Sequence, residues 1–90
     1  MNLEEFDPTK FDLGEFMADV GRAGVRMMLK IDHERLAEGG QGWTVLLSGP
    51  LVGGSGTVRW DLRRLEQCID VVVDRLKTMP GDWEWLELYE

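Results

Sequence analysis

The chain has 90 residues, of which 43% are hydrophobic, and a formal net charge of −7 at pH 7. A chain of this size holds material for a single hydrophobic core, which argues against a second domain. An excess of carboxylates disfavours binding to free nucleic acid, because such binding depends on Lys and Arg that neutralise phosphates. We therefore expect one domain over residues 1–90, with residues 1–11 as a loosely ordered lead-in.

The number of cysteines and the hydropathy of the chain indicate the cellular compartment in which the protein is found. Cys68 is the single cysteine and cannot form an intramolecular disulfide. The first residues, MNLEEFDP, lack the basic and apolar leader of a secreted protein. No apolar run approaches the roughly 20 residues that a membrane span requires. These features predict a cytoplasmic protein with no membrane partner.

The negative charge is concentrated towards the two ends of the chain. Residues 1–20 carry six acids against one base, and residues 80–90 carry four acids and no base. By contrast, residues 21–60 carry five bases against three acids, and residues 61–79 carry four of each. A charge distribution of this kind attracts cationic surfaces over long range, which favours a basic protein as the partner.

The first predicted element is a short helix over about residues 12–21. Its start has the spacing of a capping box, in which Asp12 accepts a backbone N–H and Glu15 reaches back to the cap. Apolar side chains then recur at the spacing of one helix face: Leu13, Phe16, Met17 and Val20. Gly21 follows the last of these and is expected to end the helix.

A β-hairpin is predicted next. Residues 25–35 (VRMMLKIDHER) alternate, which places Val25, Met27, Leu29 and Ile31 on one side of a strand. Residues 37–42 (AEGGQG) hold three glycines and predict the hairpin loop. Residues 43–49 (WTVLLSG) favour a second strand, with Trp43, Val45 and Leu47 on one side. Pro50 stops this strand.

The longest predicted element is a second helix. A loop at residues 49–56 (GPLVGGSG) precedes residues 57–60 (TVRW), for which a short third strand is left open. Asp61 is then expected to cap a helix of about 18 residues that ends at Pro80. Its apolar stripe repeats every three or four residues: Leu62, Leu65, Ile69, Val72, Val73, Leu76 and Met79.

The C-terminal segment alternates rings with leucines. If it is extended, Trp83, Trp85 and Tyr89 point to one face and Leu86 and Leu88 to the other, as in a strand that completes the sheet. Helix and tail remain open as alternatives. The predicted fold is a small two-layer α+β domain. Its antiparallel hairpin, or three-to-four-stranded sheet, is covered by one short and one long helix in the order α-β-β-(β)-α-(β).

The sequence lacks recognisable catalytic equipment. His33, the one histidine, and Cys68 are far apart and match no zinc-ligand spacing, so we expect no metal. We interpret His33 as a surface residue at the outgoing end of the first strand and Cys68 as a buried apolar filler. No nucleophile, base or cofactor loop is recognisable, so we expect neither an enzyme nor a cofactor.

Two candidate binding sites emerge. A glycine-rich segment is similar to a phosphate cradle but lacks the lysine and helix spacing of a P-loop; it comprises Gly53, Gly54, Ser55, Gly56 and Thr57. The acidic and aromatic ends are the stronger candidate, because aromatic residues are enriched in binding hot spots. The expected partner-binding residues are Glu84, Glu87, Glu90, Asp82, Trp83, Trp85, Tyr89, Glu4, Glu5 and Asp7.

The leading hypothesis is a non-catalytic acidic module, an inhibitor or adaptor, that binds a basic protein surface. In size and charge the chain resembles immunity proteins against toxic nucleases and phage inhibitors of host defence, in which carboxylates neutralise a cationic site. A small-ligand module that uses the loop at residues 49–56 is one alternative. A structural subunit of a homo-oligomer, such as a homodimer, is another.

Overall fold

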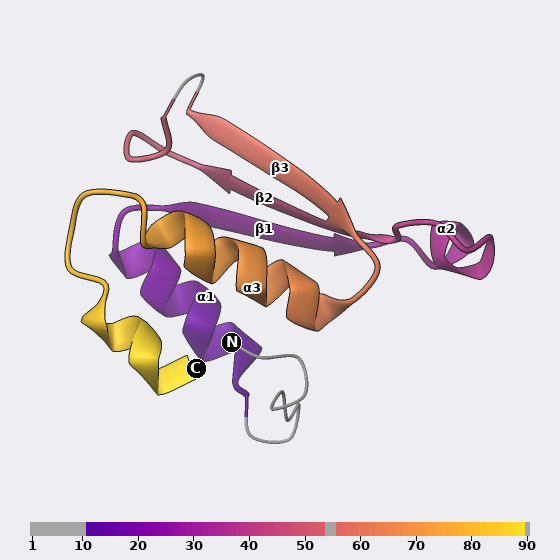
Figure 1. The fold of residues 1–90 in the computed structure, drawn as a ribbon, viewed down its shortest axis with the longest axis horizontal. Coiled ribbons are helices and arrows are strands. Elements are labelled where there is room, and N and C mark those ends of the chain that lie inside the picture. The colour runs from indigo at the N-terminus through magenta and orange to yellow at the C-terminus, as the bar shows by residue number, and fades with distance from the viewer. Residues whose placement is uncertain (1–10, 54–55, 90) are drawn as a thin grey trace.

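The computed structural model describes residues 11–53 and 56–89 (Figure 1). Glu4, Glu5, Asp7, Gly54, Ser55 and Glu90, all among the predicted binding residues, lie outside this part of the chain. Within it the elements are α1 (Leu13–Arg22), β1 (Arg26–Ile31), α2 (His33–Ala37), β2 (Trp43–Ser48), β3 (Thr57–Leu62), α3 (Leu65–Leu76) and the 3-10 helix η2 (Glu84–Tyr89).

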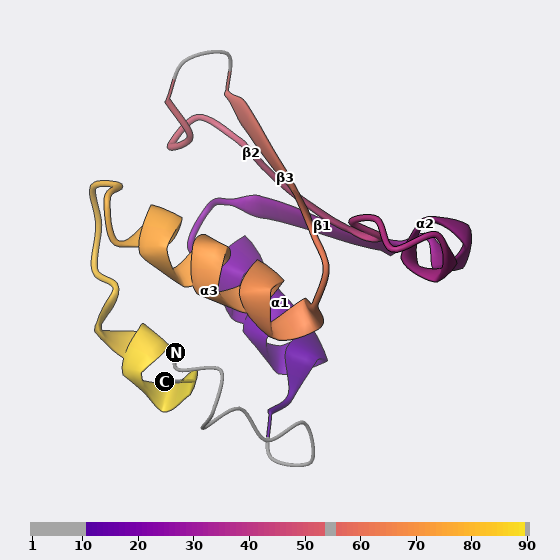
Figure 2. The same ribbon diagram turned by 45° about the vertical axis from the view of Figure 1, so that its right-hand side comes forward.

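The strands form an antiparallel sheet in the order β1-β2-β3. Helices α1 and α3 lie on one face of this sheet, and α2 projects beyond its end (Figures 1 and 2). The predicted α+β class is thus confirmed, and residues 57–60 belong to a third strand that pairs with β2. The predicted element order and number of helices differ from the structure, which adds α2 between β1 and β2 and has η2 in place of a C-terminal strand.

The core lies between the sheet and the two helices. Side chains alternate along each strand, and cross-strand partners share a face, so one face of the sheet is apolar. Val45 and Leu47 of β2 are fully buried there. Helix α3 contributes Cys68, Ile69, Val72, Val73 and Leu76, and α1 contributes Phe16 and Val20. The members of the predicted apolar stripes that lie in α1 and α3 therefore face the core, whereas Leu62 belongs to β3 and Met79 follows α3.

Helix α1 begins at the predicted cap, Asp12, but of the two hydrogen bonds of the predicted capping box the described residues show only the one accepted by the Asp12 side chain. The side chain of Asp12 accepts a hydrogen bond from the backbone N–H of Glu15 at 3.0 Å. The helix continues one residue past Gly21, to Arg22. The chain turns into β1 at Gly24, whose φ of 95° is one that glycine adopts without strain. The end predicted at Gly21 is therefore slightly early.

The hairpin connection contains a helix, α2, where the sequence predicts the end of a strand and the start of a loop. β1 ends at Ile31 because Asp32 caps α2, accepting hydrogen bonds from the backbone N–H groups of Glu34 and Arg35 at 3.0 and 3.4 Å. Gly42 closes the connection, since a Cβ there would lie 2.6 Å from the carbonyl oxygen of Asp32. His33 is exposed, but it starts α2 instead of ending a strand.

Asp61 does not cap the second helix, so that prediction is wrong. It lies in β3, where it accepts hydrogen bonds from the Thr44 hydroxyl at 2.6 Å and from Arg59 at 3.1 Å. The helix cap is formed by Gln67, whose Oε1 accepts from the backbone N–H groups of Arg63 and Arg64. Helix α3 therefore has 12 residues instead of about 18.

No helix in the described part of the chain has the length and apolarity needed to cross a bilayer.

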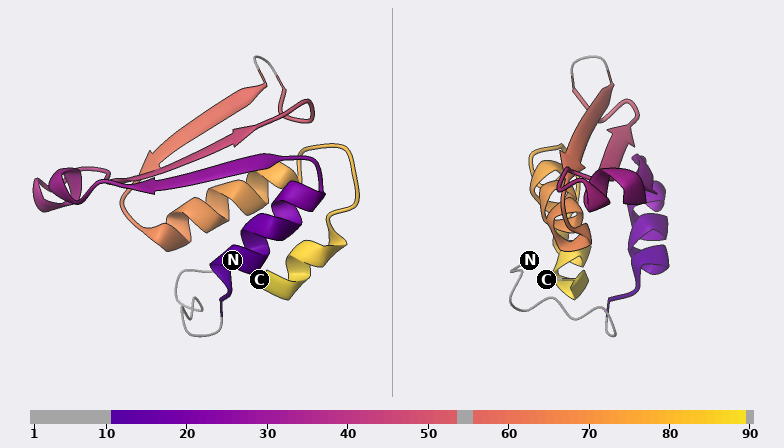
Figure 3. Two further views of the ribbon diagram at one scale, coloured as in Figure 1. Left: turned by 180° about the vertical axis from the view of Figure 1, so that it is seen from behind. Right: turned by 90° about the vertical axis from the view of Figure 1, so that its right-hand side faces the viewer.

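The C-terminal segment is a 3-10 helix, which contradicts the strand interpretation. With three residues per turn, Trp83, Leu86 and Tyr89 fall on one face. Leu86 is fully buried, and the two rings are half-buried against the core. The indole Nε1 of Trp83 donates to the carbonyl oxygen of Met79 at 2.8 Å, which fixes the turn after α3. Seen from behind, η2 lies alongside α1 (Figure 3).

Candidate binding site: an acidic and aromatic cleft

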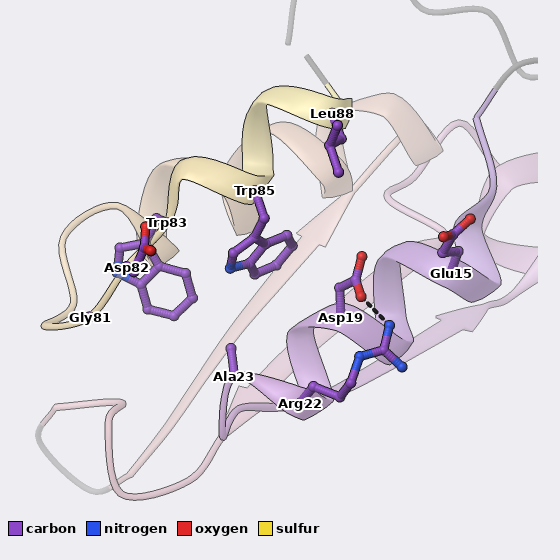
Figure 4. Close-up of a pocket in the computed structure, with 9 residues that line it drawn as sticks. All are labelled: Glu15, Asp19, Arg22, Ala23, Gly81, Asp82, Trp83, Trp85 and Leu88. Atoms are coloured by element: carbon purple, nitrogen blue, oxygen red, sulfur yellow. Dashed lines mark hydrogen bonds and ion pairs between the residues drawn. The ribbon is translucent and has the colours of Figure 1, made fainter.

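A cleft of about 630 Å³ separates α1 from the C-terminal segment (Figure 4). We call it the α1–η2 cleft. Its lining combines carboxylates, indole rings and one guanidinium: Glu15, Asp19, Arg22, Ala23, Gly81, Asp82, Trp83, Trp85 and Leu88. In this cleft the acidic and aromatic side chains of the C-terminal segment lie opposite side chains of α1.

Helix α1 supplies one wall through its periodicity. Glu15, Asp19 and Arg22 are spaced at i, i+4 and i+7, which places them along one helix face. Arg22 and Asp19 form an ion pair within this face. The buried stripe of the same helix anchors this wall, because Phe16 and Val20 pack into the core.

The second wall is aromatic and is held in place by ring contacts. The centroids of Trp83 and Trp85 are 6.0 Å apart, and those of Trp85 and Tyr89 are 6.2 Å apart at an interplanar angle of 89°. Tyr89 in turn packs edge-on against Phe16, with a centroid distance of 5.0 Å. Figure 4 shows the indole of Trp85 pointing from η2 towards α1. The rings are therefore oriented before any ligand arrives.

Asp19 connects the two walls. One of its carboxylate oxygens accepts a hydrogen bond from the Tyr89 hydroxyl, and the other accepts one from the Arg22 guanidinium. Both hydrogen bonds lower the pKa of Asp19 below its usual value, and the bond from Tyr89 has the larger effect. Burial and the same hydrogen bond raise the pKa of Tyr89. Asp19 is thus a carboxylate at neutral pH, and Tyr89 is its neutral donor.

The electrostatics of the cleft are acidic. Its lining holds three carboxylates, from Glu15, Asp19 and Asp82, against the single cation of Arg22. Glu84 and Glu87 are exposed on the neighbouring η2 helix. No described residue forms an ion pair with Asp82, Glu84 or Glu87. A cationic group can therefore approach Asp82 in the cleft, and Glu84 and Glu87 beside it, without breaking an ion pair that any of these three carboxylates forms with a described residue.

The predicted partner-binding residues that the structure describes lie at the cleft or on the exposed side of η2. Asp82, Trp83 and Trp85 line the cleft, and Tyr89 supports it from behind through Asp19. Glu84 and Glu87 are exposed on η2 without lining it. Glu4, Glu5, Asp7 and Glu90 lie outside the described residues.

Sequence reasoning missed the α1 wall. Glu15, Asp19 and Arg22 sit on the predicted first helix beside its apolar stripe. Their i, i+4, i+7 spacing was a readable signal for one polar face. It did not indicate that this face would meet the C-terminus, because that contact joins residues 70 apart in the sequence.

The glycine-rich alternative belongs to the β2–β3 connection, and its described residues, Gly53, Gly56 and Thr57, do not line the cleft. Its described backbone groups bond within the loop: Gly56 N–H donates to Gly53 at 3.2 Å, and Gly49 N–H donates to Gly56 at 3.0 Å. An anion cradle requires amides that point outward together. The amide of Gly56 is engaged instead.

The remaining reactive side chains are placed elsewhere. Cys68 is fully buried in α3, and burial raises the pKa of its thiol to about 11. His33 is exposed on α2, beyond the end of the sheet. Within residues 11–53 and 56–89, no group of three or more His, Cys, Asp or Glu side chains is placed to hold a metal ion.

The chain matches no protein-family model, no curated protein and no solved structure. The chemistry of the α1–η2 cleft therefore provides the basis for a function. Carboxylates and indole faces together bind guanidinium and ammonium groups, by charge-assisted hydrogen bonds and by cation–π attraction. The described lining residues include no histidine, cysteine, serine or lysine.

Proposed function

We propose that the chain is a non-catalytic module, an inhibitor or adaptor, that binds a basic protein surface through the α1–η2 cleft. The main support for the proposal is that carboxylates from two separate segments of the chain line the same cleft as two indole rings. Glu15 from α1 and Asp82 from the C-terminal segment both line the cleft that Trp83 and Trp85 wall. A partner's arginine entering it would stack on a ring and pair with a carboxylate.

The dimensions and rigidity of the cleft support this assignment. A volume of about 630 Å³ is typical of sites that admit a side chain or small ligand. Its aromatic wall is held by Tyr89 and by the bond from Trp83 to Met79, so little ordering is required when a ligand binds. Aromatic anchors surrounded by charge are also typical of binding hot spots.

The exposed carboxylates outside the cleft have a different role in the proposal. Glu84 and Glu87 are exposed on η2, where salt screens them. Charges of this kind accelerate the encounter with a cationic partner more than they strengthen the final complex.

We place the module in the cytoplasm, since its single thiol, Cys68, is free.

A short oligo-arginine peptide, titrated by isothermal calorimetry, tests the proposal. We expect the Glu15→Gln/Asp82→Asn variant to bind it about tenfold more weakly than the wild-type chain, because two carboxylates of the cleft are neutralised. Glu34→Gln/Glu38→Gln is the matched control, since it also removes two exposed negative charges, at α2 and away from the cleft. Equal affinity of the cleft variant and the control would exclude the cleft as the binding site.

Indole N–H signals in NMR spectra locate the contact independently of affinity. The peptide should shift the signals of Trp83 and Trp85, which line the cleft. Those of Trp43 and Trp60, which pack against the core from the sheet, should stay in place. Shifts confined to the sheet tryptophans would contradict the proposal even if the peptide bound.

A further inference from the structure

The sheet has a second face, turned away from the helices, that the proposed function leaves unused. The exposed residues of β1 alternate with its half-buried ones and are Arg26, Met28 and Lys30. Met28 pairs with Leu46 of β2, which pairs with Arg59 of β3, so these three side chains share this face. We call Arg26, Met28, Lys30, Leu46 and Arg59 the basic sheet face.

This face is cationic in a protein whose net charge is −7. The carboxylate on the same side, Asp61, already accepts hydrogen bonds from Thr44 and Arg59 and lies 3.7 Å from the guanidinium of Arg35. Arg26 and Lys30 are both exposed beside Met28. The surface therefore offers cations around an exposed methionine.

The two surfaces are complementary in both charge and hydrophobicity. Among the described residues the exposed large hydrophobic side chains are Met28, at 65% exposure, and Leu88, at 80%. Met28 lies between Arg26 and Lys30 on β1, at one edge of the basic sheet face, and Leu88 lines the acidic α1–η2 cleft. Each surface thus combines an exposed apolar side chain with an excess of charge opposite in sign to that of the other surface.

These surfaces cannot meet within one molecule. The helices α1 and α3 lie between the sheet and η2, with η2 on the far side of the helical layer (Figure 2). The basic sheet face is turned away from that layer. A contact between the two surfaces therefore requires two molecules.

We propose that a second copy of the chain docks its basic sheet face on the α1–η2 cleft, head to tail. This inference rests on the proposed function, because it uses the same cleft as the acceptor of cations. The interface is heterologous, so a dimer keeps one free cleft and one free sheet face, and further copies can add. Self-association and an external basic partner would then compete for the cleft.

Ionic strength determines whether this association is observable. Two chains of charge −7 repel each other at long range. At about 0.1 M salt the Debye length is about 10 Å, so repulsion across molecules with extents of 39 × 32 × 19 Å is largely screened while contacts of a few ångströms persist. At about 1 M salt, with a Debye length of about 3 Å, the contacts are screened as well, and we expect association at least about tenfold weaker.

The sharpest test mixes two variants, each with one surface altered. Arg26→Gln/Lys30→Gln disables the sheet face, and Glu15→Gln/Asp82→Asn disables the cleft. By analytical ultracentrifugation at about 0.1 M salt, we expect each variant alone to be monomeric at concentrations where the wild-type chain associates. Their mixture should form a 1:1 dimer and nothing larger, because one functional surface remains on each. Circular dichroism melts verify that both variants fold.

Several outcomes would overturn the head-to-tail dimer. These are a wild-type chain that stays monomeric up to about millimolar concentration, a mixture that stays monomeric, or single variants that associate as the wild type does. Binding of an oligo-glutamate peptide to the sheet face without self-association would assign that face to another acidic partner. In each case the oligo-arginine titration still reports on the cleft, so the proposed function can stand when this inference fails.

Discussion

The hydroxyl of Tyr89 donates a hydrogen bond to the carboxylate of Asp19, joining η2 to α1 across 70 residues of sequence. Around this bond the ring of Tyr89 packs on Phe11 and Phe16, at centroid distances of 5.8 and 5.0 Å. Asp19 lines the α1–η2 cleft, so the contact that closes the fold also sets the separation of the two walls of the site.

Replacing Tyr89 with Phe tests this contact. The ring packing is retained and the donor is lost, so the free energy of unfolding at pH 7 should fall. The pKa of Asp19 is lowered from about 3.8, so its hydrogen bonds stabilise the folded state above that pH and cease to do so as the pH falls through the lowered value. The difference between the two proteins in urea denaturation should therefore shrink below about pH 3.8. A pH-independent difference would show that Asp19 is not the acceptor.

Two leucines of η2 differ in burial and form a matched pair. Leu86 is fully buried, and Leu88 is 80% exposed. Leu86→Ala should lower the free energy of unfolding by about 2–5 kcal/mol, because it leaves a cavity under η2. Leu88→Ala should change it by less than about 0.5 kcal/mol. Chemical denaturation of both variants checks this, and similar effects would mean that η2 does not pack as described.

Two glycines should respond to alanine in opposite directions. A Cβ at Gly42 would lie 2.6 Å from the Asp32 carbonyl oxygen and 2.4 Å from Leu36 Cγ, so Gly42→Ala should destabilise the fold by about 1–3 kcal/mol. Gly21 lies in α1 with open space around it, and Gly21→Ala should stabilise the fold by about 0.5–1 kcal/mol. Thermal melts of the two variants provide the measurement; a neutral Gly42→Ala would refute the tight turn after α2.

The thiol of Cys68 should report on unfolding of the core. It is fully buried, and burial raises its pKa to about 11, so little thiolate is present or accessible at pH 8. Reaction with a disulfide reagent such as DTNB should be slow in the folded protein and should reach one thiol per chain in denaturant. Rapid labelling of the folded protein would place Cys68 at the surface.

The sequence determined the elements whose signal is local. Leu13, Phe16, Met17 and Val20 marked the core face of α1, and Asp12 marked its cap. The alternation of Met27, Leu29 and Ile31 marked β1. The aromatic and acidic character of the C-terminus also singled out Asp82, Trp83 and Trp85, which line the cleft. These signals suffice because period and capping depend on residues a few positions apart.

Tertiary contacts decided the remaining features. Asp61 has the right chemistry for a helix cap, yet it pairs with Thr44 on the neighbouring strand, and β3 extends through the residues expected to start the helix. The C-terminal alternation fits a strand, but the three-residue repeat of Trp83, Leu86 and Tyr89 packs against the core as a 3-10 helix. A short segment whose sequence fits both a strand and a 3-10 helix adopts the conformation that buries its apolar side chains. Which conformation buries them depends on the surface that the rest of the fold presents to the segment. For the same reason the sequence did not predict that α1 would form a wall of the cleft, because Asp19 and Tyr89 come into contact only in the folded chain.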